Sequence, residues 1–118
     1  MQVLLIDDNK ELRGFLVLAL AEGDVQCVAS DTQDALKLLD EKKFDVLIVD
    51  SVLTNTDGIT LAGKIREHRN GRNTPILLMS PIDTSLARRM AKDVGCNEFL
   101  PKPFGPAQLI EQVKNLKR

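Results

Sequence analysis

The sequence predicts an α/β domain in which a parallel β-sheet is covered by helices on both faces. Three short runs, residues 3–6, 46–49 and 76–79, are entirely apolar. Runs this short and uniform are typical of strands that are buried on both sides. Amphipathic helical patterns separate the runs, and this alternation of strands and helices is typical of α/β sheets.

The first predicted strand, 3–6, ends in an acidic pair, Asp7 and Asp8. A helix follows, because apolar residues then recur with the spacing of one helix face. We expect Gly23 to close this helix. The residues on its apolar face are Leu12, Phe15, Leu16, Ala19 and Leu20.

A weaker strand is predicted over 25–29, followed by a second helix. Asp31 is the candidate N-cap of that helix, because a carboxylate can accept a hydrogen bond from a free N–H of the first turn. Asp34 and the aliphatic residues within 35–39 continue the amphipathic pattern.

The central strand lies within 44–50 and ends at Asp50. In an open α/β sheet the ligand crevice lies beyond the carboxyl ends of the strands, so we expect Asp50 at its mouth. A polar loop, 51–58, leads to a third helix. Its inward-facing residues are Ile59, Ala62 and Ile65.

The fourth strand, 76–79, ends at Ser80, and a fourth helix covers 84–94. Gly95 ends this helix, as glycine commonly does. We expect four of its residues to face the core: Ala87, Met90, Ala91 and Val94.

The fifth strand is short, 98–100, and leads to Lys102 between two prolines. Pro106 then opens the last helix, at a position that tolerates the missing N–H. The core-facing residues of that helix are Leu109, Ile110, Val113 and Leu116.

The second and fifth strands are the least apolar, as edge strands should be. We therefore favour the flavodoxin-like strand order 2-1-3-4-5 with right-handed crossovers, which places five helices on two faces. The length of 118 residues suits one domain, 1–118.

Composition argues against several functions. The 16 basic and 17 acidic residues give a net charge of −1, so there is no electrostatic footprint for nucleic acid. There is no Trp or Tyr to stack on bases. No apolar run approaches the ~20 residues that cross a bilayer, and no signal peptide precedes the first strand, so we expect a cytoplasmic protein without membrane contact.

Polar side chains follow four of the five predicted strands. Asp7 and Asp8 follow the first, Asp50 the third, Ser80 the fourth and Lys102 the fifth. These strands are neighbours in the favoured order, so we expect the side chains to converge. Three carboxylates repel one another unless a cation is present, and Mg²⁺ is the expected cofactor.

The carboxylates, the hydroxyl and the ammonium group at these strand ends, together with Mg²⁺, suit the transfer of a phosphoryl group to a carboxylate. Asp50 would attack phosphorus in line, while Mg²⁺ and Lys102 offset charge on the phosphoryl oxygens. Ser80 could donate a hydrogen bond to another of these oxygens. The product would be an aspartyl phosphate.

Over essentially its whole length the chain resembles the receiver domain of response regulators in two-component signalling. The family pattern is an acidic pair after the first strand, an acceptor Asp after the third, Ser or Thr after the fourth and Lys-Pro after the fifth. The matching residues are Asp7-Asp8, Asp50, Ser80 and Lys102-Pro103, with Asp57-Gly58, Gly95-Cys96 and Pro103-Phe104 also in register.

The resemblance implies a phosphorelay switch that receives a phosphoryl group on Asp50 from a phosphohistidine. The donor would be a sensor histidine kinase or a phosphotransfer protein. Such a domain catalyses its own phosphorylation and dephosphorylation and is not a conventional turnover enzyme. The implied Mg²⁺ ligands are Asp7, often through water, Asp8, Asp50 and the backbone carbonyl of Val52.

The resemblance also implies a conformational switch. Ser80 would move towards the phosphoryl group and Phe99 would follow it inward. This repacks the face formed by 84–94, 98–100 and the last helix, where a downstream partner or output domain binds. The Lys102–Pro103 bond is often cis in similar proteins. The domain is expected to be a monomer or a weak homodimer.

Four residues depart from the usual pattern or bear on the lifetime of the phosphate. Thr54 stands where many relatives have Pro, and Pro81 stands where many have a small residue. In the family that the chain resembles, the positions of Val52 and Ile82 border the approach of hydrolytic water, so we expect their apolar side chains to prolong the phosphorylated state.

Three other functions remain open alternatives. One is a receiver-like scaffold that works without phosphorylation. A Mg²⁺-dependent phosphatase would need its aspartyl nucleophile on the first strand and a second Asp two residues on, whereas this chain has Asp7-Asp8-Asn9. A flavodoxin-type flavin binder would need a phosphate loop at that place, and acidic residues would repel the phosphate.

Overall fold

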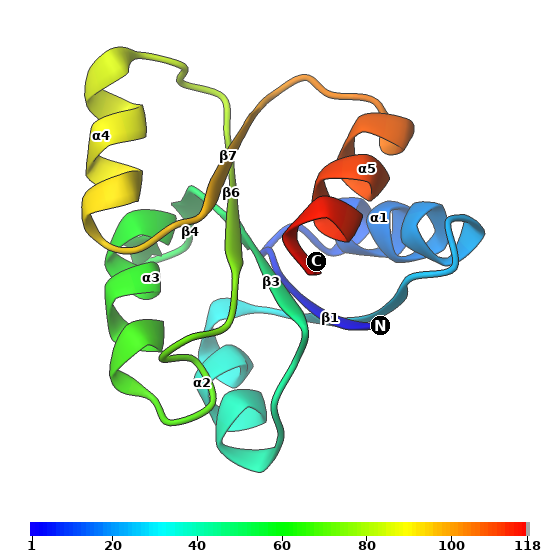
Figure 1. Cartoon of the computed structure of the whole chain (residues 1–118), viewed down its shortest axis with the longest axis horizontal. Helices are drawn as coiled ribbons and strands as arrows, with labels where there is room; N and C mark the ends of the chain where they lie inside the picture. The colour runs from blue at the N-terminus through cyan, green and yellow to red at the C-terminus, as the bar shows by residue number, and fades with distance from the viewer. Residues whose placement is uncertain (118) are drawn as a thin grey trace.

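The computed structural model describes residues 1–117, which form a five-stranded parallel sheet flanked by helices (Figure 1). The strands of this sheet are β1 (Gln2–Ile6), β2 (Gln26–Ser30), β3 (Val46–Asp50), β6 (Ile76–Ser80) and β7 (Glu98–Pro101). The helices are α1 (Lys10–Glu22), α2 (Thr32–Glu41), α3 (Gly58–Glu67), α4 (Ser85–Asp93) and α5 (Pro106–Lys117). The sheet order is β2-β1-β3-β6-β7, which confirms the predicted flavodoxin-like order.

The sheet separates two hydrophobic cores. Helices α1 and α5 cover one face, and α2, α3 and α4 cover the other (Figure 1). Successive residues of β1 alternate between the cores: Leu4 and Ile6 pack under α2 and α3, whereas Val3 and Leu5 pack under α1 and α5. All four are fully buried, as a strand covered on both faces requires. None of the helices within 1–117 is long and apolar enough to cross a membrane.

Two residues predicted to face the core are exposed instead. Phe15 of α1 is 57% exposed and Met90 of α4 is 46% exposed. The buried stripe of α1 is centred on Leu16 and Leu20, and that of α4 on Ala91, so Phe15 and Met90 lie at the edges of these stripes. Apolar spacing alone does not show how wide a stripe the sheet covers.

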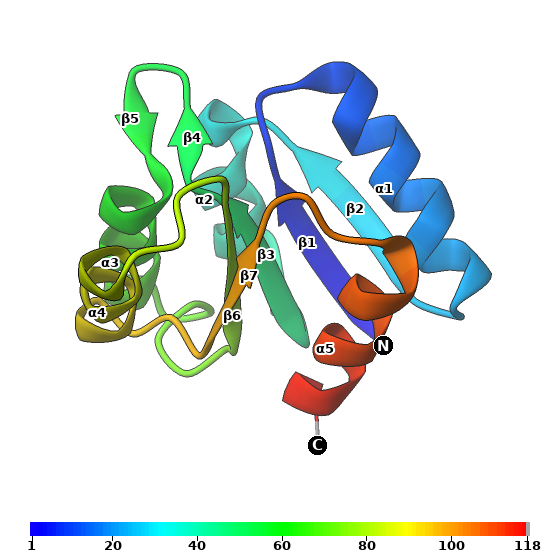
Figure 2. The same cartoon turned by 90° about the horizontal axis from the view of Figure 1, so that it is seen from above.

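The segment predicted as a polar loop after β3 contains a small antiparallel ribbon. Strands β4 (Val52–Leu53) and β5 (Thr56–Asp57) pair with each other at the edge of the molecule (Figure 2). Asn55 turns the chain between them with a left-handed φ of 65°. The two strands are too short for their side-chain alternation to be recognised in the sequence.

Gly58 brings the start of α3 close to the end of the central strand. Its N–H donates a hydrogen bond to the Ser51 carbonyl at 2.9 Å. A Cβ at this position would overlap the Asp50 carbonyl oxygen and lie 2.8 Å from the Ser51 Cα atom. A residue without a side chain is therefore required beside Asp50.

The matched pair Gly58→Ala and Gly63→Ala tests this close approach. Gly58→Ala should lower the free energy of unfolding by about 2 kcal/mol, because backbone atoms must move to admit the methyl group. Gly63 lies in the same helix, and an added Cβ there would meet no atom within 4 Å beyond its own turns of helix. Gly63→Ala should therefore raise the free energy of unfolding by roughly 0.5–1 kcal/mol. Urea denaturation measures both, and equal effects would contradict the contact at Gly58.

Candidate functional site

The structure places the predicted site residues at one edge of the sheet. Asp50 and Ser80 are the last residues of β3 and β6, Asp7 directly follows β1, and Lys102 directly follows β7. Asp7, Asp50 and Ser80 are buried, whereas the Lys102 side chain is 26% exposed. This edge is where parallel strands present their carboxyl ends to a ligand.

Asp50 lies at the centre of the site. The ammonium group of Lys102 donates a hydrogen bond to Asp50 Oδ1 at 3.1 Å, and the two groups form an ion pair. The backbone N–H of Val52 donates to the same oxygen at 3.2 Å. Because the Asp50 side chain is 7% exposed, this pairing offsets most of the cost of burying its charge.

Asp7 is buried beside Asp50 with an incomplete set of partners. Its Oδ1 atom accepts a hydrogen bond from the Asn9 N–H at 2.8 Å, whereas its buried Oδ2 atom has no hydrogen-bond partner. Burial, together with repulsion from Asp50, raises the pKa of Asp7 to about 6, although the Asn9 N–H and the Lys102 charge oppose this. The site therefore holds more negative charge than its own cation compensates.

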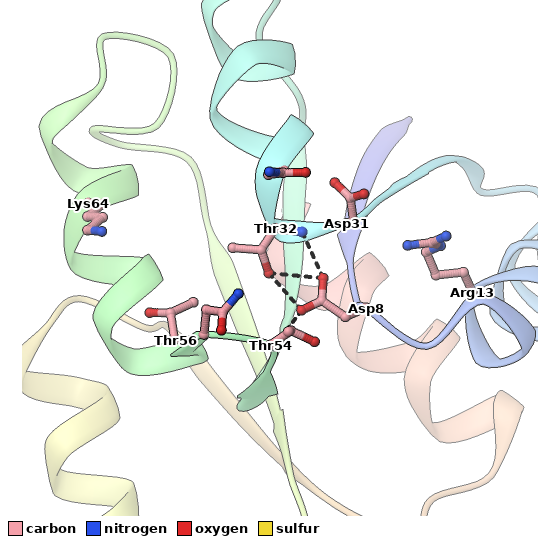
Figure 3. Close-up of a pocket in the computed structure, with 9 residues that line it drawn as sticks. Asp8, Arg13, Asp31, Thr32, Thr54, Thr56 and Lys64 are labelled. Carbon is pink, nitrogen blue, oxygen red and sulfur yellow. Dashed lines mark hydrogen bonds between the residues drawn. The ribbon is translucent and has the colours of Figure 1, made fainter.

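Asp8 faces the N-terminus of α2 and the β4–β5 turn (Figure 3). Its carboxylate accepts hydrogen bonds from the Thr32 N–H at 2.9 Å and from the Thr54 N–H at 2.6 Å. The Thr32 hydroxyl donates to both carboxylate oxygens at 3.1 Å. Partial burial by itself would raise the pKa of Asp8. The hydrogen bonds from Thr32 and Thr54 outweigh this effect and lower the pKa below its ordinary value.

The two predicted switch residues are both buried. Ser80 Oγ accepts a hydrogen bond from the Ile82 N–H at 3.1 Å and donates one to the Ile82 carbonyl at 3.2 Å. Phe99 is 8% exposed, and the guanidinium group of Arg88 lies 4.8 Å from its ring centroid. Arg88 also pairs with Asp83 at 2.6 Å. The Phe99 ring thus already lies inside the protein.

The oxygen atoms at this edge fit a hard divalent cation in part. Asp7 and Asp50 supply neighbouring carboxylates, and the partnerless Asp7 Oδ2 atom is a suitable ligand for Mg²⁺. The backbone of Val52 also lies beside Asp50, through its hydrogen bond to that carboxylate. Within 1–117, however, no three acidic, His or Cys side chains are grouped to hold a metal ion. The carboxylate of Asp8 is engaged by Thr32 and Thr54.

Comparison with known proteins decides the family. The family model described as the response regulator receiver domain matches residues 3–114. The chain belongs to the response regulator receiver domain family. The Lys102–Pro103 bond is cis, as the resemblance led us to expect.

Individual relatives support the assignment. The transcriptional regulatory protein CpxR of Klebsiella pneumoniae is 31% identical over 118 residues, which cover 99% of this chain and 49% of CpxR. The chain thus spans about half the length of the curated transcriptional regulators that it matches.

Solved structures agree with the fold. The chemotaxis protein CheY4 of Vibrio cholerae is 25% identical with a TM-score of 0.91, and the match covers 98% of this chain and 97% of CheY4. The receiver domain of the sensor histidine kinase PA1611 from Pseudomonas aeruginosa is 24% identical with a TM-score of 0.87, covering 98% of this chain and 96% of that one. That structure was solved with a magnesium ion coordinated in its active site cleft.

Thr32 and Thr54 contribute to the receiver site but were not identified as site residues from the sequence. Asp31 was recognised as a helix N-cap, and the favoured strand order puts the start of that helix next to the end of the first strand. These two observations together could have placed the free N–H of Thr32 near Asp8. For Thr54 the sequence offered one signal, since a Thr where many relatives have Pro retains a backbone N–H. The sequence did not show that this N–H reaches Asp8 through the β4–β5 turn.

In metal-free buffer, Asp7→Asn should raise the free energy of unfolding by about 2 kcal/mol near neutral pH. The pKa of Asp7 is about 6 in the folded protein against an ordinary value of 3.8, so its charged form disfavours folding above that pKa. The advantage of the variant should shrink as the pH falls from about 6 towards 4 and should be lost well below 3.8, where the carboxyl group is protonated in both the folded and the unfolded state.

Urea denaturation across this pH range, with a chelator present, measures the effect of Asp7→Asn. Asp93→Asn on the exposed end of α4 is the matched control and should change stability little. If Asp7→Asn instead lowered the free energy of unfolding at neutral pH, the conclusion that the charged Asp7 side chain opposes folding would be wrong.

Proposed function

We propose that this domain is the phosphoacceptor switch of a two-component phosphorelay, in which Asp50 accepts a phosphoryl group in a Mg²⁺-dependent reaction. The donor is a phosphohistidine on a sensor histidine kinase or a phosphotransfer protein. The observation that carries the proposal is the buried Asp50 carboxylate, paired with Lys102 and next to Asp7 at the carboxyl edge of a receiver fold.

In the proposed reaction an Asp50 oxygen forms a bond to phosphorus while the bond between phosphorus and the donor imidazole nitrogen breaks. The electron pair of that bond stays on the imidazole, which takes up a proton. The Lys102 ammonium group would stabilise the phosphoryl oxygens, at a place where low exposure strengthens the attraction.

The expected cofactor is Mg²⁺, held by Asp7, Asp50 and the Val52 carbonyl, with Asp8 available once it leaves its threonine partners. When bound, Mg²⁺ would offset negative charge on the transferred group. Asp7 would bind the cation through its Oδ2 atom, which has no hydrogen-bond partner. The burial of Asp7 beside Asp50 makes a cation favourable at this place.

We further propose that phosphorylation changes the face formed by α4, β7 and α5. The Ser80 hydroxyl would exchange its hydrogen bonds with Ile82 for one to the phosphoryl group. This exchange would shift the equilibrium between two packings of the region. Leu86 and Met90 are exposed on α4, at 66% and 46%, and offer apolar contacts to a downstream partner or output domain.

Receiver domains are signalling domains, and on this proposal the chain acts in the cytoplasm through its own reversible phosphorylation. It would be monomeric or weakly dimeric.

Incubation with acetyl phosphate and Mg²⁺ should add one phosphoryl group to the protein, measured as intact mass. Asp50→Asn should abolish the gain, and Lys102→Ala should reduce it by about ten-fold or more, because the charge beside the acceptor is lost. Intact mass is the suitable measurement because the chain has no Trp to report on the site.

Two controls define the outcome of this assay. Asp93→Asn should be phosphorylated like the natural chain, and a chelator should prevent phosphorylation of both proteins. A folded natural chain that gains no mass would contradict the proposal and favour a phosphorylation-independent scaffold. A gain that survives Asp50→Asn would place the acceptor elsewhere.

The phosphorylated protein should persist for minutes or more after removal of the phosphodonor. Val52 and Ile82 are 62% and 60% exposed and lie two residues beyond Asp50 and Ser80, where apolar side chains hinder an attacking water. The double variant Val52→Asn, Ile82→Ala should lose phosphate several-fold faster in the same mass assay. A natural half-life of seconds would contradict this role.

A further inference from the structure

The carboxylate of Asp8 has both of its oxygens engaged by protein donors. Oδ1 accepts from the Thr32 N–H and hydroxyl at 2.9 and 3.1 Å, and Oδ2 accepts from the Thr54 N–H and the Thr32 hydroxyl at 2.6 and 3.1 Å. Figure 3 shows Asp8 between these two threonines, which belong to different elements. Asp7, its neighbour in the chain, instead has a buried oxygen without any partner.

The two donors have distinct physical origins. Thr32 is the first residue of α2, where backbone N–H groups lack helical partners and the helix dipole favours an anion. Thr54 lies in the turn of the β4–β5 ribbon, between Leu53 and the left-handed Asn55. Asp8 therefore connects the β4–β5 ribbon to α2 through hydrogen bonds. Asp8 and Thr54 are 46 residues apart in the sequence.

These bonds compete with metal ligation. Hydrogen bonds to an ionised carboxylate are among the stronger ones in proteins, and a metal would need the same oxygen lone pairs. The carboxylates of Asp7 and Asp50 lie next to each other. Asp8 does not join them, since no group of three potential metal-binding side chains exists within 1–117. Binding of Mg²⁺ by Asp8 would thus require at least one of its threonine bonds to break.

We infer that Thr32 and Thr54 are positioning residues that hold Asp8 away from the metal site and thereby weaken the binding of Mg²⁺. This inference rests on the proposed function, because it concerns the Mg²⁺ site of that reaction. Binding of Mg²⁺ is then coupled to release of the β4–β5 turn from Asp8. The affinity for Mg²⁺ therefore depends on α2 and on the β4–β5 turn, which supply the donors to Asp8.

Thr54→Pro tests the inference directly, because proline has no backbone N–H to donate. The extended β4 residue before position 54 is compatible with a following proline. Isothermal titration with MgCl₂ should give a dissociation constant about ten-fold lower for Thr54→Pro than for the natural chain, equivalent to loss of one charge-assisted hydrogen bond.

Thr54→Ala is the matched control, because it keeps the N–H that bonds Asp8 and removes only the side chain, whose hydroxyl is the weakest of the contacts that lower the pKa of Asp8. Its Mg²⁺ affinity should stay within about two-fold of that of the natural chain. Equal affinities for the natural chain and Thr54→Pro would overturn the inference, as would an equal change in Thr54→Pro and Thr54→Ala.

A second pair of measurements keeps the inference testable if Thr54→Pro fails to fold. Thr32→Ala removes the two hydroxyl bonds while keeping the N–H, and should tighten Mg²⁺ binding by about three-fold. In the natural chain, the amide proton resonances of Thr32 and Thr54 should move upfield as Mg²⁺ is added, because their bonds to Asp8 weaken. Unchanged resonances at saturating Mg²⁺ would overturn the inference.

These outcomes are distinct from failure of the proposed function. If the natural chain binds Mg²⁺ and is phosphorylated but Thr54→Pro binds no more tightly, only the positioning role fails. If neither protein binds Mg²⁺, the metal site of the proposed reaction and the positioning role both fail.

Discussion

Two carboxylates buried side by side, Asp7 and Asp50, are the constraint around which this edge of the sheet is arranged. Asp7 directly follows β1 and Asp50 ends the adjacent strand β3. Lys102 pairs with Asp50, whereas the nearby Arg13 guanidinium donates to the backbone carbonyl of Asp7 and not to its carboxylate. Buried like charges oppose folding, so this edge of the sheet is less stable without a cation or another charge-compensating group. A site of this kind gains stability from what it binds, which is the physical basis of a switch driven by ligation or modification.

The remainder of the fold supports this charged edge. The aliphatic residues of the three central strands are fully buried between two helical layers, so the ends of these strands are held firmly. Gly58 lets the start of α3 approach the Asp50 backbone, and its N–H bonds to Ser51. In the surrounding turns, Asp8 accepts hydrogen bonds from α2 and from the β4–β5 ribbon.

The arrangement of Ser80 and Phe99 bears on how the proposed switch would work. Phe99 already packs in the core beneath Arg88, while the Ser80 hydroxyl is engaged within its own turn. In the proposed switch the Ser80 hydroxyl would give up its bonds to Ile82, and Phe99 would start from a buried position.

The sequence by itself determined the five strands of the main sheet and the five helices, because continuous apolar runs report burial on both faces. It favoured the strand order through its two less apolar edge strands, and with that order the edge at which Asp7, Asp50, Ser80 and Lys102 lie. It did not predict the β4–β5 ribbon. It did not determine the exposure of Phe15 and Met90, since spacing alone does not define the width of a covered stripe. Only the tertiary structure decided the direction of the Asp8 carboxylate. Its hydrogen-bond donors, Thr32 and Thr54, lie 24 and 46 residues away, and no local pattern encodes which backbone N–H groups a folded chain will leave free beside it.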